Sequence, residues 1–202
     1  MARAGLTPDR VIAEAERLAD QVGLDALTLA ALADMLGVRQ PSLYKHVDGL
    51  SALKRAISVR AKAELADTLT RAAVGKSRAE AVRSVAEAFR AWAHAHPGRY
   101  EASVTAPDPN DAEDAAASAA VVTVVLDVLA GYGLDGPDAI DATRALRSAL
   151  HGFVSLEAAG GFGLPRSLDH SYARMVEGFI TSLEHEWVAG RAGDPGNLGA
   201  ES

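Results

Sequence analysis

The sequence predicts an all-α protein, and three features of its 202 residues lead to that prediction. Apolar residues make up 49% of the chain but aromatic residues only 5%, and alanine dominates, so residues that favour helices outnumber those that favour strands. Apolar side chains recur every three or four positions in several segments, which is the period of an amphipathic helix. Glycine and proline stand between these segments, where helices begin and end.

The segment 27–53, LTLAALADMLGVRQPSLYKHVDGLSAL, predicts two short helices joined by a tight turn. Thr28 is suited to cap the first helix, because its hydroxyl can accept a hydrogen bond from a free backbone N–H. Gly37 follows the last apolar position, where a left-handed residue commonly ends a helix. Pro41 is tolerated because it falls in the first turn of the second helix. This arrangement is a helix-turn-helix.

The second of these helices has a polar outer face. Leu43 and Val47 are four residues apart and are expected to anchor it to the core. The polar residues around them can hydrogen-bond base edges or phosphates, and Tyr44 can also pack on sugars or a thymine methyl group. An ordinary helical hairpin with a polar surface is the alternative, but the caps, the glycine and the polar leading edge occur together here.

The stretch GVRQPSLYKHV resembles the recognition helix of the TetR family of transcriptional regulators. The resemblance covers residues 6–53 and returns at 150–164, LHGFVSLEAAGGFGL, which is similar to the WHG type of regulatory domain in that family. It implies an all-helical homodimer in which an N-terminal three-helix domain binds a palindromic operator, while a C-terminal domain binds an inducer and dimerises. The predicted DNA-contacting residues are Thr28, Arg39, Gln40, Pro41, Ser42, Tyr44, Lys45, His46 and Lys54.

Three positions depart from the family's pattern. Many relatives carry Ser where this chain has Arg39, which cannot cap the recognition helix and whose charge opposes the helix dipole, as expected if it points at DNA. Ala30 stands where one member of the family has an Arg that reads a guanine. Leu50 stands where many relatives have a Lys that contacts phosphate. The resemblance therefore implies the mode of binding but not the operator sequence.

The net charge of −7 is unevenly distributed along the chain. Residues 1–60 carry 8 basic and 7 acidic side chains, whereas residues 61–202 carry 12 and 20. Between Gly37 and Arg60 there are five basic residues and one acid, Asp48. We therefore expect a locally positive DNA-reading face and an acidic body. Cysteine is absent and no signal peptide is visible, so we expect a cytoplasmic protein without disulfides.

The remaining helices are expected at 8–22, from about 48 to 73, from about 77 to 96, and at about 111–130, 138–159 and 168–189. Thr7 is expected to cap the first of them and Asp48 the second. The predicted domains are a helix-turn-helix DNA-binding domain at 1–50 and a helical regulatory and dimerisation domain at 51–190. The glycine-rich stretch 191–202 is expected to be disordered.

Two segments suggest other functions and are interpreted as structural. The run AAASAAVVTVVLDVLAGYGL at 115–134 is about as long as a membrane span, but its alanines and Asp127 favour a helix buried all round in the regulatory domain. The sequence GYGLDG at 131–136 has the glycine spacing of a dinucleotide-binding loop. It follows a helix and not a strand, and Asp135 would repel a phosphate, so it predicts a turn.

Polar and aromatic residues of the C-terminal part predict an inducer pocket and a dimer interface. His151 is the most informative of them, although a buried histidine bonded to backbone or another side chain is the simpler interpretation. The predicted ligand-binding residues are Phe89, Trp92, Tyr100, Val121, Val125, Ser148, His151 and Ser155. The predicted four-helix dimer interface contains Gly152, Tyr172, Val176, Phe179, Ile180 and Leu183. His94 and His96 are two residues apart and do not form a chelating pair, so no metal is predicted.

These features predict a ligand-responsive regulator, most readily a repressor that binds a palindromic operator as a homodimer and is released by a small hydrophobic inducer. No catalytic residue is predicted, because no nucleophile-elbow serine or plausible carboxylate pair occurs, and no cofactor is expected. The alternative is a helical interaction protein or an enzyme whose helix-turn-helix is structural. Salt-dependent binding to palindromic DNA would distinguish the two.

Overall fold

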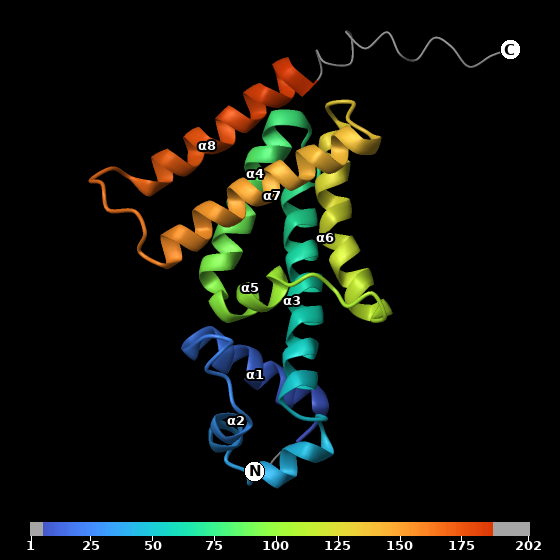
Figure 1. Ribbon diagram of the computed structural model, residues 1–202, viewed down its shortest axis with the longest axis vertical. Coiled ribbons are helices and arrows are strands. Elements are labelled where there is room, and N and C mark those ends of the chain that lie inside the picture. Colours follow the sequence, from blue (N-terminus) through green and yellow to red (C-terminus); the bar gives the residue numbers. More distant parts are fainter. Residues whose placement is uncertain (1–5, 188–202) are drawn as a thin grey trace, which may run out of the picture. The chain divides into compact units, whose positions relative to one another are not determined.

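The computed structural model of the protein describes residues 6–187. Over that range it consists of helices and loops, without a β-strand, as predicted (Figure 1). The elements are α1 (Pro8–Val22), α2 (Leu29–Leu36), the 3₁₀ helix η1 (Gln40–Lys45), α3 (Leu50–Ala73), α4 (Arg78–Ala95), α5 (Pro97–Val104), α6 (Ala112–Ala130), α7 (Gly136–Ala158), α8 (Leu168–Ser182) and the π-helical turn η2 (Leu183–Trp187). The tail predicted to be disordered lies outside the described residues.

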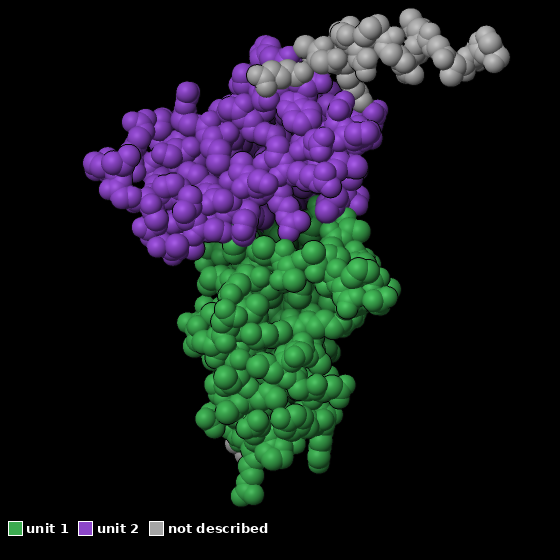
Figure 2. Space-filling model, viewed as in Figure 1, with its two compact units in different colours: residues 1–67, 91–121 green, residues 68–90, 122–202 purple. Residues whose placement is uncertain are grey.

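The chain forms two compact units (Figure 2). Unit 1 contains residues 1–67 and 91–121, and unit 2 contains residues 68–90 and 122–202. This division differs from the predicted domains because residues 51–67 and 91–121, predicted to belong to the regulatory domain, fall in unit 1. Ala102 of α5, for example, belongs to the same buried cluster as the apolar residues of α1 and α2.

Local hydrogen bonds set the ends of α1 and α2 as predicted. The Thr7 hydroxyl accepts from the backbone N–H of Arg10 at 3.2 Å, and the Thr28 hydroxyl accepts from that of Ala31 at 3.1 Å. Gly23 follows α1 at φ 88°, and Gly37 follows α2 in the left-handed conformation at φ 65°. Both glycines therefore occupy conformations that other residues adopt only with strain.

The second helix of the helix-turn-helix is a short 3₁₀ helix. The backbone N–H of Ser42 donates to the carbonyl of Arg39, and that of His46 to the carbonyl of Leu43, each at 2.8 Å. Both bonds span three residues, which is the 3₁₀ pattern. Arg39 makes no side-chain cap, as its chemistry predicts.

Helix α3 begins two residues after the predicted cap, Asp48. Gly49 precedes the helix directly, at φ 95°, and its carbonyl accepts from the backbone N–H of Leu53 at 3.1 Å. One face of α3 is apolar and buried, with side chains at most 4% exposed: Leu53, Ile57, Ala61, Leu65 and Leu69.

Helix α5 was not expected, because Pro97 was interpreted as the end of the preceding helix. The proline instead occupies the first turn of a new helix, where a missing N–H costs nothing. A second expectation, that α6 is buried all round, is wrong for the single chain. Its Val128 and Leu129 are buried, but Val122 is 38% exposed. None of the described helices combines the length and apolar character needed to cross a membrane.

In unit 2, α7 and α8 pack through one apolar face each. The buried residues of α7 include Leu146, Leu150 and Phe153, and those of α8 include Tyr172 and Val176. The segment before α7 is a turn, as predicted for GYGLDG.

Candidate nucleic-acid interface

The reading segment η1 is fixed to unit 1 by two buried side chains. Leu43 is fully buried and Val47 is 9% exposed, and both join the cluster formed by α1, α2 and α3. Leu32 of α2 is also fully buried there. A single apolar core thus holds the two helices of the helix-turn-helix at a fixed angle, which a DNA-reading element requires.

The predicted reading residues share the outer surface of η1. Tyr44 is 55% exposed, which is unusual for an aromatic side chain without a partner to cover it. Arg39, Gln40, Pro41 and Lys45 are exposed. Ser42 and His46 are half-buried. This surface offers guanidinium, amide, hydroxyl, ammonium and imidazole groups, which are the donors and acceptors that contact bases and phosphates.

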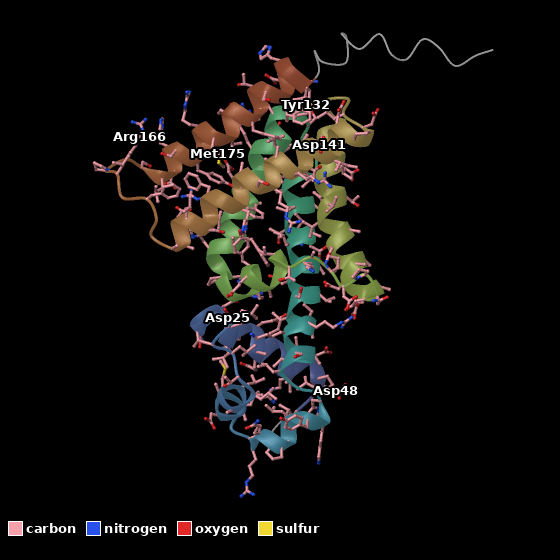
Figure 3. All side chains as sticks on the ribbon, in the orientation of Figure 1. Asp25, Asp48, Tyr132, Asp141, Arg166 and Met175 are labelled. Atoms are coloured by element: carbon pink, nitrogen blue, oxygen red, sulfur yellow. The ribbon has the colours of Figure 1, made fainter. Side chains whose placement is uncertain are left out.

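Two residues of the predicted set already have partners within unit 1. The oxygen of Thr28 accepts the cap bond of α2, so its O–H can donate to a phosphate while the cap is kept. The Lys54 ammonium lies 3.7 Å from a carboxylate oxygen of Asp25, in the loop between α1 and α2 (Figure 3). A phosphate would have to compete with this carboxylate for Lys54. Asp25 is almost fully exposed, so water screens its attraction for the ammonium.

The net positive charge near the reading segment η1 is smaller than the sequence predicted. Of the five basic residues between Gly37 and Arg60, three pair with acids. Arg60 binds Glu16 at 3.0 Å, and Arg55 binds Glu113 at 2.8 Å and also Asp111. Within residues 6–187, the two that pair with no acid are Arg39 and Lys45.

Burial of Glu16 explains why Arg60 points toward α1. Glu16 is 7% exposed, and this desolvation raises the pKa of its carboxyl above the ordinary value, while the nearby Arg60 opposes the rise. The ion pair therefore compensates a buried acid of α1, and we expect it to persist when DNA binds.

The predicted ligand-binding residues divide between the two units. Trp92, Tyr100 and Val121 belong to unit 1, and the others to unit 2. Trp92 is 5% exposed, and its indole N–H has no hydrogen-bond acceptor among the described residues. In unit 2, the hydroxyl of Ser155 lies 3.4 Å from Nε2 of His151. The simpler interpretation of His151, a partly buried side chain bonded to another, accounts for this contact.

Four of the six predicted dimer-interface residues are buried inside their own unit. Val176, Ile180, Leu183 and Tyr172 are at most 4% exposed, and the Tyr172 hydroxyl donates to the carbonyl of Ala86 at 2.7 Å. These side chains attach α8 to unit 2, so they cannot face a second chain without leaving this core. Apolar periodicity alone does not tell a face buried within the chain from one buried against a partner.

The long-range ion pairs of unit 2 were not among the predicted features. Arg90 of α4 binds Glu157 of α7 and Asp169 of α8, and Arg83 binds Glu177. Their residues are 67 to 94 positions apart in the sequence. No spacing rule relates positions so far apart in the sequence. From the sequence alone, charge pairs can be predicted only between neighbouring positions of one helix.

The core-anchored reading segment and the all-helical body define a helix-turn-helix DNA-binding protein. Comparison with known proteins gives the family. Residues 11–48 match the family described as bacterial regulatory proteins, tetR family, and residues 82–179 match the tetracyclin repressor-like C-terminal domain. The chain is 42% identical over 158 residues to the uncharacterised HTH-type transcriptional regulator Rv0681 of Mycobacterium tuberculosis, covering 78% of this chain and 72% of that protein.

A second relative and a solved structure agree with this result. The HTH-type regulator YobS of Bacillus subtilis is 33% identical over 183 residues, covering 90% of this chain and 94% of the relative. A TetR variant from Acinetobacter baumannii AYE, solved in complex with minocycline, superposes with a TM-score of 0.66 at 26% identity, covering 89% of this chain and 97% of that one. The chain belongs to the TetR family of DNA-binding transcriptional regulators.

Proposed function

We propose that this regulator is a repressor that binds a palindromic operator as a homodimer through η1 and is released by a small amphipathic inducer. The observation that carries the proposal is the exposed polar surface of η1 above the buried Leu43 and Val47. Among residues 6–187 no side chain covers Tyr44, which is 55% exposed, and the groups of this surface match base edges and phosphates.

Gln40 and Tyr44 are proposed to read bases, and Lys45 to contact phosphate. DNA fragments selected from a random pool by the purified protein supply the operator. Q40A or Y44A should then weaken operator binding by about 1–3 kcal/mol and relax the preference at one base position per half-site. K45A should weaken binding to operator and to random DNA alike. It should also reduce the slope of log affinity against log salt by about 1 for each copy of η1 that is bound.

Arg17 provides a matched control for these variants. It lies on α1, is 62% exposed and pairs only with its neighbour Glu14 within the described residues. R17A should leave both affinities unchanged. Equal losses on operator and random DNA for Q40A, Y44A and K45A would contradict direct base reading.

A second chain is proposed to pack on the glycine-containing faces of α7 and α8. A Cβ built on Gly152 or on Gly178 meets no atom within 4 Å, so both glycines face open space in the single chain. Leu156, one turn after Gly152, is 51% exposed. Helices with glycine at a crossing approach closely, and a twofold dimer would set the two reading heads about 34–36 Å apart.

Substitution of these glycines tests the dimer. Gly178→Arg should give a monomer in light scattering and weaken operator binding, because one head makes too few contacts. Ala173→Arg is the control, since position 173 is also exposed but lies about 140° around α8 at 100° per residue. A monomeric wild-type protein would contradict this part of the proposal.

The inducer is proposed to supply a hydrogen-bond acceptor to Trp92. The indole group can only donate, and a buried donor without an acceptor costs free energy that a carbonyl or carboxylate of a ligand would recover. The minocycline complex supports a small-molecule ligand, because it shows one bound to a protein of this fold. In a DNA-release assay, Trp92→Phe should reduce the response to an inducer found by screening and keep operator affinity without it. An equal loss of basal DNA binding would show that Trp92 only supports the fold.

A further inference from the structure

Helix α5 packs closely on α1 within unit 1. A Cβ built on Gly98 would lie 2.2 Å from the carbonyl carbon and oxygen of Ala19, so only glycine fits there. Glu101 accepts a hydrogen bond from the backbone N–H of Leu24 at 3.1 Å, just after α1. Ala102 completes the apolar cluster that also contains Leu43 of the reading segment. Any change at the start of α5 therefore acts on the core beneath η1.

A cluster of charged groups lies at this contact. Arg99 of α5 donates through its backbone N–H and Nε to the two carboxylate oxygens of Asp20 on α1, at 2.9 and 2.8 Å. It also donates through Nη1 to Glu64 of α3 at 2.7 Å. Three helices are thus joined by one guanidinium, and Glu16 and Arg60 extend the same electrostatic cluster.

His96 lies in the middle of this cluster, just before α5. Its Nδ1 is 3.7 Å from Asp20, and its Nε2 is 3.7 Å from Glu64. Nδ1 also contacts Nη2 of Arg99. Because a guanidinium can only donate, Nδ1 must be the acceptor in this contact, which requires a neutral ring with its proton on Nε2. The ring is 26% exposed and packs edge-on against Trp92.

The charges of the cluster do not balance while His96 is neutral. The charged groups that contact it are the carboxylates of Asp20 from α1 and Glu64 from α3 and the guanidinium of Arg99 from α5, while Glu16 and Arg60 form an ion pair beyond them. One positive charge is missing. Histidine is the side chain that supplies such a charge between about pH 5 and 8.

Protonation would exchange one set of contacts for another. Nδ1 would become a donor, could no longer accept from Arg99 and would repel its positive charge. Because a guanidinium is planar and rigid, the Arg99 side chain would have to turn away as a whole, while its backbone N–H keeps the bond to Asp20. The imidazolium would then pair with Asp20 on one side and with Glu64 on the other. These pairs would tie the start of α5 to both α1 and α3, and the local negative charge that repels DNA would be neutralised.

We infer that His96 is a proton-responsive element of this regulator, whose protonation strengthens DNA binding without touching DNA. The inference requires DNA binding, which the family establishes, but neither the dimer nor the inducer of the proposed function. The imidazolium pairs take over the link between α1, α3 and α5 from the Arg99 guanidinium, and the added positive charge reduces the electrostatic repulsion between unit 1 and the DNA phosphates.

The test is the affinity for a DNA fragment selected by the wild-type protein, measured from about pH 8 to about pH 6 at constant ionic strength. A second histidine, His46, lies in the reading surface, so the comparison uses H46Q as the background. In H46Q, affinity should rise by about threefold or more as the pH falls. In H46Q/H96Q this rise should disappear. H46Q/H94Q is the matched control, because His94 is an exposed histidine two positions before His96, in the last turn of α4, and it should keep the rise.

A merely structural role of His96 would lower affinity equally at both ends of the pH range. A rise that persists in H46Q/H96Q, or one absent from H46Q, would overturn the inference. E64Q in the same background offers an independent variant, because the amide keeps an oxygen acceptor for Arg99 but removes the charge that an imidazolium would face. The rise should shrink in H46Q/E64Q. If H96Q does not fold, as judged by thermal unfolding, E64Q decides: an undiminished rise overturns the inference and a diminished one supports it.

Discussion

Arginine serves different purposes in the two units. In unit 1, Arg55, Arg60 and Arg99 join helices through carboxylates at the edge of an aliphatic core that consists of valine, leucine, isoleucine and alanine. In unit 2, Arg90 lies against aromatic rings, with its guanidinium carbon 4.9 Å from the Tyr172 ring centre and 5.8 Å from that of Phe153. Arg78 contacts Tyr132 in the same way, at 4.6 Å.

Arginines pair with carboxylates in both units, and in unit 2 Arg90 also stacks on aromatic rings. Carboxylate pairs depend on charge and weaken when an acid is protonated, whereas a guanidinium stacked on rings also contributes packing that acid does not remove. Unit 1 should therefore respond to charge substitutions and pH, and unit 2 to the shape of the side chain that replaces an arginine.

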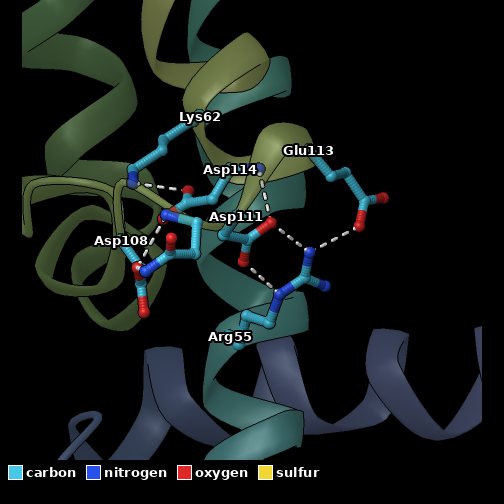
Figure 4. A network of polar contacts seen from close by, with 7 residues as sticks. Arg55, Lys62, Asp108, Asp111, Glu113 and Asp114 are labelled. Carbon is cyan, nitrogen blue, oxygen red and sulfur yellow. Dashed lines mark hydrogen bonds and ion pairs between the residues drawn. The ribbon is translucent and has the colours of Figure 1, made fainter.

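The largest effect is expected at the buried pair between α3 and α6, where Lys62 and Asp114 lie 2.6 Å apart and are 3% and 11% exposed (Figure 4). Lys62→Met should cost about 3–5 kcal/mol in denaturant unfolding, because it leaves the Asp114 carboxylate buried without its partner. The double variant K62M/D114L should recover most of that loss, since two apolar side chains leave no buried charge. A double variant no better than K62M would contradict this explanation.

Arg90 provides the corresponding test in unit 2. Arg90→Met should cost about 2–3 kcal/mol, because the stacked guanidinium is lost and Glu157, only 12% exposed, loses its partner. Arg90→Lys keeps the charge but not the planar fork, so it should recover only part of the loss in the same unfolding assay. Full recovery by lysine would mean that the charge of Arg90, and not its stacking on the rings, provides its contribution to stability.

The sequence predicts those features that depend on residues close together in the chain. Thr7 and Thr28 cap helices because an oxygen and an N–H three residues apart are already neighbours, and Gly37 ends α2 for reasons contained in its own backbone. The reading residues around Leu43 follow from the same local pattern. By contrast, Arg55 looked like part of a positive face because its partners Asp111 and Glu113 are more than fifty positions away. Tyr172 and Ile180 looked available to a partner chain because periodicity shows that a face is apolar but not what covers it.

A smaller effect is expected where stability is local. Thr28→Ala removes the hydroxyl that accepts from the Ala31 N–H, and it should cost about 1 kcal/mol in the same unfolding assay. Thr28→Ser keeps the hydroxyl and serves as the control, with a loss well below that of alanine. Equal losses for alanine and serine would show that the methyl group, and not the cap, stabilises α2.

The smallest effect is expected at Asp111, where unit 1 should show its sensitivity to acid (Figure 4). The hydrogen bond from Arg55, helped by the backbone N–H of Asp114, lowers the pKa of Asp111 from 3.8 to about 2. A carboxyl whose pKa is lower in the folded state binds protons more readily when unfolded, so its contribution to stability is complete above about pH 4 and is lost as the pH falls toward about 2. In thermal unfolding, Asp111→Asn should therefore reduce the fall of the melting temperature across that window and change little above it. Asp141→Asn is the control, because the ion pair of Asp141 with Arg144 joins neighbouring exposed positions of one helix at 3.4 Å. If D111N and the wild type lost stability in parallel below about pH 4, the Arg55 bond to Asp111 would not contribute to the folded state in solution.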